Sequence, residues 1–335
     1  MNLVIQLPAL NEAASIGAVL DRLPQTLPGI ATIQVLVIDD GSTDGTGDLA
    51  RGKGARVIRH ERNQGVGAAF RSGLRAAIDL GADVLVSMDA DGQFNSADIA
   101  TLIQPIIDGE ADFVSGSRFK DPALVPAMPA AKRWGNRVIA SWLGRMTGQT
   151  FYDVSCGFRA YARSAFLRLD PQGAFTYTHE VFLALAFAGL RIREVPVAVR
   201  GVREHGHSRV AHNLFRYAWR AAAIILATYR DYRPVQFFGA IGAVLAGGGF
   251  VFVGFLFVHW LSTGALFPYR AVGFAGAALV GAGLLLYLIG LVAAMLVRLR
   301  SGVEEALLRA GEVQHMLQHQ SHRKTGQFAE RRRDE

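Results

Sequence analysis

Residues 84–93 read VLVSMDADGQ, a short, largely apolar run that ends in an acidic turn. The run Val84–Met88 is rich in β-branched side chains, which is typical of a strand buried on both faces of a parallel sheet. Asp89, Asp91 and Gln93 follow it directly, and such sheets bind ligands beyond the carboxyl ends of their strands. The stretch therefore predicts a buried strand that brings two carboxylates and an amide to one edge of a sheet.

The same pattern extends outward through the first half of the chain. Other short apolar runs predict strands at Leu3–Leu7, Gln34–Ile38, Arg56–Arg59 and Phe113–Ser117. Helical patterns between several of them predict helices at Glu12–Leu23, Val66–Leu80 and Ala97–Ile107. Strands that alternate with helices indicate an α/β fold, with a mostly parallel sheet covered by helices on both faces.

Polar clusters lie at the ends of four of the predicted strands. They read PALNE at 8–12, DDGSTDGT at 39–46, DADGQ at 89–93 and SGSRF at 115–119. Because parallel strands end at the same edge of a sheet, we expect the four clusters to lie together. The fold then gathers the side chains that can do chemistry at one edge.

Composition and charge exclude several classes of protein. Of the 335 residues 51% are hydrophobic, so an intrinsically disordered chain is excluded. The single cysteine, Cys156, excludes a disulfide-stapled module and is expected to be an inert packed thiol. The net charge is +7, and residues 200–233 alone hold seven arginines against two acidic side chains. This basic collar favours a membrane surface over nucleic acid as the partner.

Residues 234–297 form an almost uncharged stretch whose one formal charge is Arg270. Val235–Leu261 and Ala271–Val297 are each long enough to cross a hydrocarbon core of ~30 Å. A short turn-like segment joins them, which predicts a transmembrane hairpin. Buried helices of a soluble core are the alternative, and the length and lack of charge disfavour it.

Arginines flank the outer ends of the predicted hairpin, at 230, 233, 298 and 300. By the positive-inside rule this places both termini and the N-terminal domain in the cytosol, in a multi-pass protein of the cytoplasmic (inner) membrane. Small residues at four-residue spacing, Ala243/Gly247 and Gly273/Ala277/Gly281, permit close helix contacts. Such contacts fit packing within the hairpin and a homo-oligomer equally well.

The predicted organisation therefore has four parts. An α/β domain occupies residues 1–210, and an amphipathic helix at 211–233 is expected to lie at the membrane interface. An ordinary packed helix is the alternative for 211–233. The hairpin occupies 234–297, and a basic cytosolic tail at 298–335 is expected to be helical to about Gln318 and then partly disordered.

Two more motifs complete an ordered set with the four clusters, NQGVGAAF at 63–70 and SCGFRAY at 155–161. In this order the six motifs resemble the inverting GT-A glycosyltransferases of family 2. More narrowly, the chain resembles the polyprenyl-phosphate sugar transferases typified by dolichyl-phosphate mannose synthase, and its hairpin matches the layout of the bacterial type. The resemblance spans roughly residues 1–210 by motif.

The resemblance implies an activity and its partners. A sugar would pass from a nucleotide-sugar, GDP-mannose or a UDP-hexose, to a polyprenyl phosphate such as undecaprenyl or dolichyl phosphate. The reaction would occur at the cytoplasmic face of a lipid bilayer. Related bacterial enzymes associate as tetramers, and the small-residue faces of this chain permit a homo-oligomer.

The acidic turn is the candidate metal site. Two carboxylates, Asp89 and Asp91, and the amide oxygen of Gln93 suit a hard cation such as Mg²⁺ or Mn²⁺. The cation would bridge the donor diphosphate and neutralise charge as the leaving group departs. An Asp-rich turn without a metal is the alternative.

The resemblance also assigns the donor contacts. It implies nucleotide-sugar binding by residues of the first loop, the second loop, the acidic turn, the fifth strand end and an R-x-x-G-x-S-R loop: Pro8, Asn11, Glu12, Asp39, Asp40, Asp89, Ala90, Arg118, Arg203, Ser208 and Arg209. Helix capping is the alternative for the first two loops. The loop at 203–209 is expected to close over the donor diphosphate.

The acceptor side is assigned in the same way. Arg118 is expected to point at phosphate, and Asp153 is the candidate acid nearest the acceptor, where it orients the lipid phosphate or acts as a base. With Asp91 they form the predicted catalytic set. The alternative for Asp153 is a simple pair with Arg159. Acceptor or membrane contacts are expected from Lys132, Arg133, Arg216 and Arg220.

Two other functions are weighed against this one. A glycan-extending synthase of the same superfamily would carry Q-x-x-R-W, but Arg133–Trp134 is preceded by Ala130 where the Gln would stand. A non-catalytic membrane scaffold would have no reason to keep acids and arginines at one sheet edge. Both alternative functions are therefore disfavoured.

Overall fold

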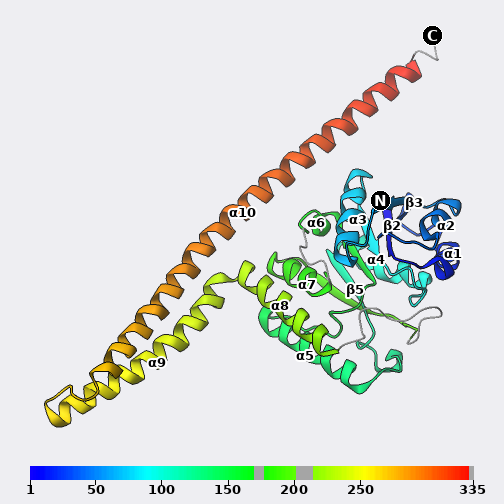
Figure 1. Cartoon of the computed structure of the whole chain (residues 1–335). Coiled ribbons are helices and arrows are strands. Elements are labelled where there is room, and N and C mark those ends of the chain that lie inside the picture. Colours follow the sequence, from blue (N-terminus) through cyan, green and yellow to red (C-terminus); the bar gives the residue numbers. More distant parts are fainter. Residues whose placement is uncertain (170–176, 201–213, 332–335) are drawn as a thin grey trace. The chain divides into compact units, whose positions relative to one another are not determined.

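The computed structural model describes residues 1–169, 177–200 and 214–331 (Figure 1). The chain divides into two compact units, Met1–Thr228 and Tyr229–Glu335.

The first unit is built on one seven-stranded mixed sheet. Its strands are β1 Asn2–Ala9, β2 Thr32–Asp39, β3 Arg56–Arg59, β4 Val84–Ser87, β5 Phe113–Ser117, β6 Arg159–Ala162 and β7 Ile192–Pro196. They lie in the order β3-β2-β1-β4-β6-β5-β7. β6 runs antiparallel to β4 and β5, while the other pairs are parallel. The five predicted strands are confirmed, and β6 and β7 are additional.

Helices connect most of the strands. They are α1 Ala13–Asp21, α2 Thr46–Gly52, α3 Val66–Asp79, α4 Ile99–Ile107, α5 Ala130–Thr147, α6 Arg163–Phe166 and α7 Thr178–Phe187, with short 3₁₀ turns η1 Ser96–Asp98 and η2 Pro122–Leu124. α8, Leu214–Tyr232, begins in the first unit and crosses its boundary. Because Ala221 and Ile225 of α8 are buried, the start of this helix belongs to the first unit.

The core consists of two apolar layers, one on each face of the sheet. Strand β1 shows why, since its side chains alternate between the faces. Leu3, Ile5 and Leu7 pack with residues of α1, α2 and α4, whereas Val4 packs in the cluster that contains residues of α3, α5 and α7. Strands that are buried on both faces carry apolar side chains at most positions, which explains the apolar runs in the sequence.

The sheet topology brings the predicted polar clusters to one edge. β1, β2, β4 and β5 all run in the same direction, so the loops after them emerge at their shared carboxyl edge. The antiparallel β6 begins at that edge, so the segment before it lies there too. The fold therefore gathers the acidic turn, Arg118 and the motif at 155–161 in one region.

The second unit is a helical hairpin of α9, Pro234–Thr263, and α10, Arg270–Arg331 (Figure 1). Two 30-residue segments, Pro234–Thr263 and Arg270–Leu299, are long and apolar enough to cross a membrane. The apolar 18-residue stretches within them have mean hydropathies of 2.3 and 2.5, and only 11% of each stretch is buried. Apolar surface exposed on this scale is typical of membrane-associated helices. α10 continues to Arg331, past the predicted end near Gln318.

Glycines allow the backbones of α9 and α10 to lie in close contact. A methyl group on Gly249 would lie 2.6 Å from the Gly276 carbonyl oxygen, and one on Gly242 would lie 2.5 Å from that of Gly283. Among the predicted small residues, Gly247 and Gly281 have open space around them, so they are not the close contacts within the hairpin. Backbone contact at small residues replaces the hydrophobic driving force that helices lack in lipid.

We expect Gly249→Ala to destabilise the hairpin by about 1–3 kcal/mol, because the added methyl would overpack against backbone atoms. The neighbouring Gly248→Ala is the matched control, since nothing lies within 4 Å of that position. Thermal unfolding in detergent measures both variants. Equal melting temperatures for the two would contradict this account of the helix contact.

Candidate active site

The acidic turn after β4 is buried at its second aspartate. Asp91 is 2% exposed, and its Oδ1 accepts a hydrogen bond of 3.1 Å from the Gln93 backbone N–H. The Gln93 side-chain Nε2 donates to the Arg200 carbonyl oxygen at 2.9 Å. A methyl group on Gly157 would lie 3.1 Å from Asp89 Oδ2, so the loop before β6 lies directly against the first aspartate.

The acidic turn can supply part of the coordination of a divalent cation. Among the described residues, no group of three His, Cys, Asp or Glu side chains could form a complete metal cage. Asp89, Asp91 and Gln93 supply oxygen atoms, the ligands that Mg²⁺ and Mn²⁺ prefer. Mg²⁺ in particular is commonly held by one or two carboxylates, with water and substrate phosphates as its other ligands. The donor set therefore suits a cation that shares its coordination with a phosphorylated substrate.

The first two loops are joined to each other by hydrogen bonds. The Asn11 backbone N–H donates to Ser42 Oγ at 2.9 Å, and the Thr43 N–H donates back to Asn11 Oδ1 at 2.8 Å. The Glu12 N–H donates to Thr46 Oγ1 at 2.9 Å. Asn11 has φ 51°, a left-handed conformation that asparagine tolerates better than most residues. Asn11 thus joins the first two loops, the loops to which the resemblance assigns nucleotide contacts.

The start of α1 is tied to the acidic turn as well. Ser15 Oγ donates to the Ala90 carbonyl oxygen at 2.9 Å and also contacts Glu12 Oε2 at 3.2 Å. Pro8 lies at the end of β1, opposite Ile38 of β2. Pro8, Glu12 and Ala90, which are predicted to bind the nucleotide-sugar, therefore lie in one region.

Asp39 is fully buried at the end of β2, and its predicted contact with a nucleotide stays a prediction. Its Oδ1 accepts from the Ser42 N–H at 2.8 Å, which closes the turn. Its Oδ2 is buried and accepts no hydrogen bond from the described residues, and Arg59 Nε lies 3.5 Å from it.

Asp40 is buried as well, and its predicted contact with a nucleotide also stays a prediction. It is 4% exposed, and its carboxylate accepts from the backbone N–H groups of Gln64 at 2.9 Å and Gly65 at 2.8 Å. His60 Nδ1 lies 2.6 Å from Asp40 Oδ1, and His60 Nε2 lies 2.9 Å from Ser72 Oγ. Asp40 thus holds the loop before α3, and the buried His60 fixes its orientation.

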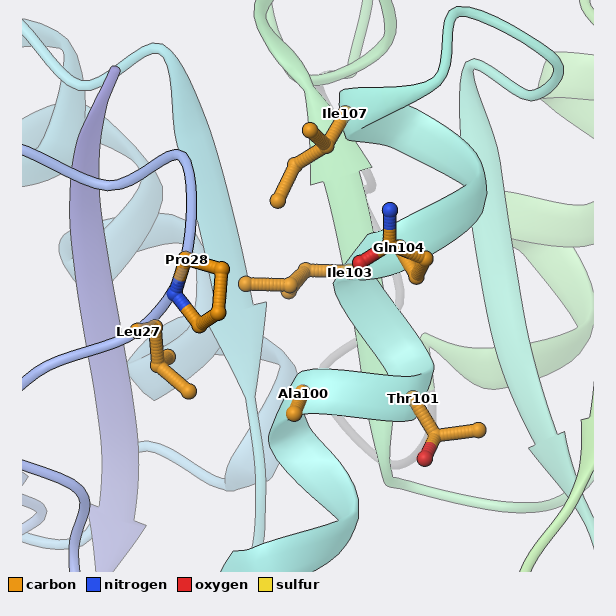
Figure 2. A pocket seen from close by; sticks show the side chains of 7 residues that line it. All are labelled: Leu27, Pro28, Ala100, Thr101, Ile103, Gln104 and Ile107. Carbon is orange, nitrogen blue, oxygen red and sulfur yellow. The ribbon is translucent and has the colours of Figure 1, made fainter.

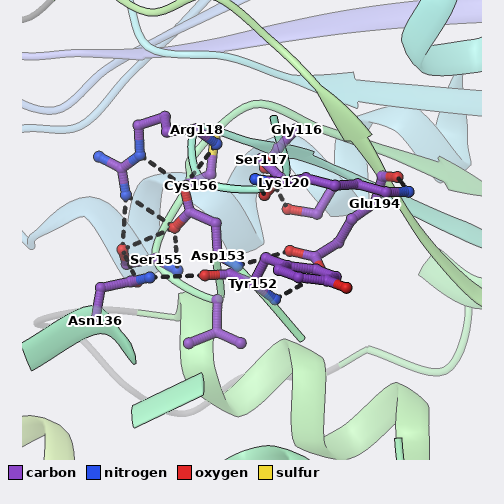
Figure 3. A network of polar contacts seen from close by, with 12 residues as sticks. Gly116, Ser117, Arg118, Lys120, Asn136, Tyr152, Asp153, Ser155, Cys156 and Glu194 are labelled. Atoms are coloured by element: carbon purple, nitrogen blue, oxygen red, sulfur yellow. Dashed lines mark hydrogen bonds and ion pairs between the residues drawn. The ribbon is translucent and has the colours of Figure 1, made fainter. Parts of the chain in front are cut away.

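Arg118 and Asp153, which the resemblance assigns to the acceptor side, form an ion pair (Figure 3). Arg118 Nε and Nη2 donate to the two carboxylate oxygens at 2.6 and 2.9 Å, and the Arg118 backbone N–H adds a bond of 3.1 Å. The N–H and hydroxyl of Ser155 also donate to Asp153 Oδ1. Asp153 is fully buried, while the Arg118 side chain is 22% exposed. These contacts fix the Arg118 guanidinium against the Asp153 carboxylate.

The alternative that Asp153 pairs with Arg159 is wrong. Arg159 is fully buried, and its guanidinium donates to the backbone carbonyls of Cys156, Thr178 and Val154 at 2.7, 3.0 and 2.9 Å. It lies 4.8 Å from the centre of the Phe182 ring, close enough for a cation–π contact. Arg159 therefore holds the 154–156 segment to the start of α7.

Three more polar groups that the sequence analysis missed surround Asp153. Asn136 of α5 donates to the Tyr152 carbonyl at 2.8 Å and accepts from Ser155 Oγ at 2.9 Å. Glu194 of β7 accepts from the Tyr152 and Asp153 backbone N–H groups. Lys120 Nζ donates to the Glu194 carbonyl oxygen at 2.6 Å. Single polar residues in otherwise ordinary helix and strand patterns gave no signal of these contacts.

Burial keeps two nearby groups uncharged at neutral pH. It raises the pKa of the Cys156 thiol to about 12, with the negative charge of Asp153 adding to the shift. Burial also lowers the pKa of His179 to about 4, and the positive charge of Arg159 acts in the same direction. The expected inert, packed Cys156 agrees with this environment, because its thiolate is strongly disfavoured.

The remaining predicted site residues lie on helices or outside the described residues. Lys132 and Arg133 are exposed in the first turn of α5, and Arg220 is exposed on α8. The backbone of Arg216 lies in α8, but its side chain is outside the described set. Arg203, Ser208 and Arg209 lie outside the described residues altogether.

A separate pocket of about 300 Å³ lies between the loop before β2 and helix α4 (Figure 2). Ile103 and Ile107 point from α4 toward Pro28. The pocket is mainly apolar, lined by Leu27, Pro28, Ala100, Thr101, Ile103, Gln104 and Ile107. Since the loop before β2 lies at the amino ends of the strands, this pocket is not part of the candidate active site.

The mostly parallel sheet, with D-x-D at the end of a central strand, has the GT-A type of fold found in glycosyltransferases. The chain belongs to glycosyl transferase family 2, whose family model matches residues 4–169. The UDP-N-acetylglucosamine–dolichyl-phosphate N-acetylglucosaminyltransferase of Methanococcus voltae is 32% identical over 57% of this chain and 82% of its own length. The undecaprenyl-phosphate mannosyltransferase of Micrococcus luteus is 31% identical over 63% and 88%.

Solved structures agree on the fold. Glucosyl-3-phosphoglycerate synthase from Mycobacterium tuberculosis, crystallised with Mn²⁺, UDP and glucosyl-3-phosphoglycerate, superposes with a TM-score of 0.54. The likeness covers 68% of this chain and 79% of that one at 22% identity. At this identity the likeness concerns the fold alone.

We expect Asp40→Asn to lower the free energy of unfolding by about 1–3 kcal/mol, because the amide cannot accept from all the donors that surround the carboxylate. Asp21→Asn is the control, since Asp21 pairs with Lys53 on the surface and is 57% exposed. Its effect should stay within about 0.5 kcal/mol. Chemical denaturation measures both variants, and equal effects would contradict the bracing role of Asp40.

Proposed function

We propose that this chain transfers a hexosyl group from a nucleotide-sugar to the phosphate of a polyprenyl monophosphate at the cytoplasmic face of a membrane. The observation that carries the proposal is the acidic turn and the Arg118–Asp153 pair at one sheet edge, in a chain that also contains an apolar helical hairpin. The names of two relatives, which state dolichyl-phosphate and undecaprenyl-phosphate activities, support this acceptor class.

On the donor side, Asp89, Asp91 and Gln93 would hold Mg²⁺ or Mn²⁺. When bound, this cation would neutralise the charge that develops on the departing nucleoside diphosphate. Asp91 is buried and held by the Gln93 backbone, so its carboxylate is oriented before substrate arrives. The loop that contains Arg203, Ser208 and Arg209 would add positive charge near the diphosphate.

On the acceptor side, the nucleophile is an oxygen of the lipid phosphate. A phosphate monoester has a second pKa of about 6, so it is mostly dianionic at neutral pH and needs no general base. Its oxygen would attack the anomeric carbon as the bond from that carbon to the donor diphosphate breaks, with inversion. Arg118 would orient the phosphate, and Asp153 would act by fixing the Arg118 guanidinium.

Exposed side chains on two helices support a membrane-bound acceptor. Trp134 on α5 is 69% exposed and follows Lys132 and Arg133. Trp219 on α8 is 72% exposed and precedes the exposed Arg220. Tryptophan beside basic residues is the composition found at the headgroup level of a bilayer.

The proposed layout keeps the predicted parts. Residues 1–210 would carry out catalysis in the cytosol, and 211–233 would lie at the membrane interface. The spans 235–261 and 271–297 would form the hairpin of a multi-pass protein of the cytoplasmic membrane. Both termini would then lie on the cytosolic side.

The proposal is tested by incubating detergent-purified protein with undecaprenyl phosphate, Mg²⁺ or Mn²⁺, and a panel of nucleotide-sugars. Mass spectrometry should detect a glycosylated lipid phosphate with one donor. Asp91→Ala or EDTA should abolish the product, because charge on the leaving group would no longer be neutralised. Asp108→Ala, at an exposed position after α4, should leave it unchanged.

Two outcomes would count against the proposal. Release of nucleotide from a donor without any lipid product would point to a different acceptor. Full activity of Asp91→Ala or in excess EDTA would remove the acidic turn and the cation from the mechanism.

A further inference from the structure

We propose that Glu194 is a positioning residue of the acceptor side, which fixes the backbone that carries Asp153 and thereby the guanidinium of Arg118. This inference rests on the proposed function of the Arg118–Asp153 pair. Glu194 lies on β7, a strand that the sequence analysis did not predict, and its backbone pairs with Ser115 of β5.

The two carboxylate oxygens of Glu194 bind two successive backbone N–H groups (Figure 3). Oε1 accepts from Asp153 at 2.7 Å, and Oε2 accepts from Tyr152 at 2.8 Å. A carboxylate can accept at both oxygens, whereas an amide has one accepting oxygen and one donating nitrogen. The site therefore requires an acid of this length, and glutamine cannot replace both bonds.

The charge environment of Glu194 supports a positioning role. Glu194 is 7% exposed, and burial raises the pKa of its carboxyl group. The negative charge of Asp153 also raises this pKa, while the two N–H groups and the charge of Lys120 lower it. Lys120 donates to the Glu194 backbone oxygen, so the contacts of the carboxylate itself are with backbone N–H groups.

The contacts continue from this backbone to the exposed end of the site. Asp153 accepts from Arg118 N, Nε and Nη2, so a shift of the Asp153 backbone would shift the guanidinium as well. Arg118 is the partly exposed member of the chain of contacts. Displacements of about 1 Å in a reacting geometry can cost roughly a hundredfold in rate.

The test begins with Glu194→Gln, which keeps the side-chain length. Turnover with undecaprenyl phosphate should fall by about tenfold or more, because the guanidinium loses its fixed position. The KM for the nucleotide-sugar should stay near the wild-type value, which a general loss of structure would not allow. Glu110→Gln is the matched control, because Glu110 pairs on the surface with Arg193, the neighbour of Glu194 on β7.

A double-mutant cycle tests whether Glu194 acts through Asp153. If it does, Glu194→Gln combined with Asp153→Asn should be no slower than Asp153→Asn alone. Multiplicative losses in the double variant, or wild-type turnover of Glu194→Gln, would overturn the inference.

Glu194→Asp keeps the charge and both oxygens but withdraws them by one methylene, and it serves if the glutamine variant does not fold. Reduced acceptor turnover with an unchanged donor KM supports the inference, and wild-type turnover overturns it. Failure of the proposed function is a separate result. The wild-type protein would then release nucleotide without forming a glycosylated lipid, and the same cycle would be measured on nucleotide release.

Discussion

The antiparallel placement of β6 between β4 and β5 is the constraint on which the site depends. A strand inserted in the opposite direction begins where its neighbours end, so the segment before β6 enters the site edge from the second half of the domain. That segment carries Asp153 to Arg118 and Gly157 to Asp89. Arg159, the first residue of β6, holds the segment in place through three backbone carbonyls. A buried guanidinium is tolerated there because its donors are matched by acceptors and aromatic rings.

This part of the edge is consequently held together by one ion pair and by hydrogen bonds from buried carboxylates to backbone N–H groups. Asp153 and Glu194 are buried acids, and Arg118 and Lys120 are the cations beside them. Each acid makes charge-assisted hydrogen bonds, which are stronger than those between neutral groups. Such an arrangement is organised before any substrate binds, so little reorganisation is needed when a phosphate arrives.

Local sequence patterns predicted the sheet and the place of the site, but not the partners of each side chain. Val84–Met88 revealed its strand because burial on both faces demands apolar residues, and the acidic turn revealed the strand's end. The bracing contacts of Asp40 were not predicted because its donors, at 60, 64 and 65, lie some twenty residues further along the chain. Glu194 was missed because a single acid in the mixed stretch RIREVP at 191–196 has the same appearance whether it faces water or a backbone N–H. Contacts between distant segments depend on the order and direction of the strands. The antiparallel β6, which local patterns did not predict, brings Asp153 to Arg118.

The helix α10 has 62 residues, of which the apolar segment accounts for the first thirty. At 1.5 Å per residue the whole helix extends roughly 90 Å, and the part beyond Leu299 extends about 50 Å. A hydrocarbon layer can therefore contain only the first part of this rod. In a hairpin that crosses a bilayer along its normal, the basic end near Arg331 would lie several Debye lengths of ~8 Å from the lipid surface at physiological salt. Charge at that end would then act on the surrounding solution and hardly at all on the lipid surface.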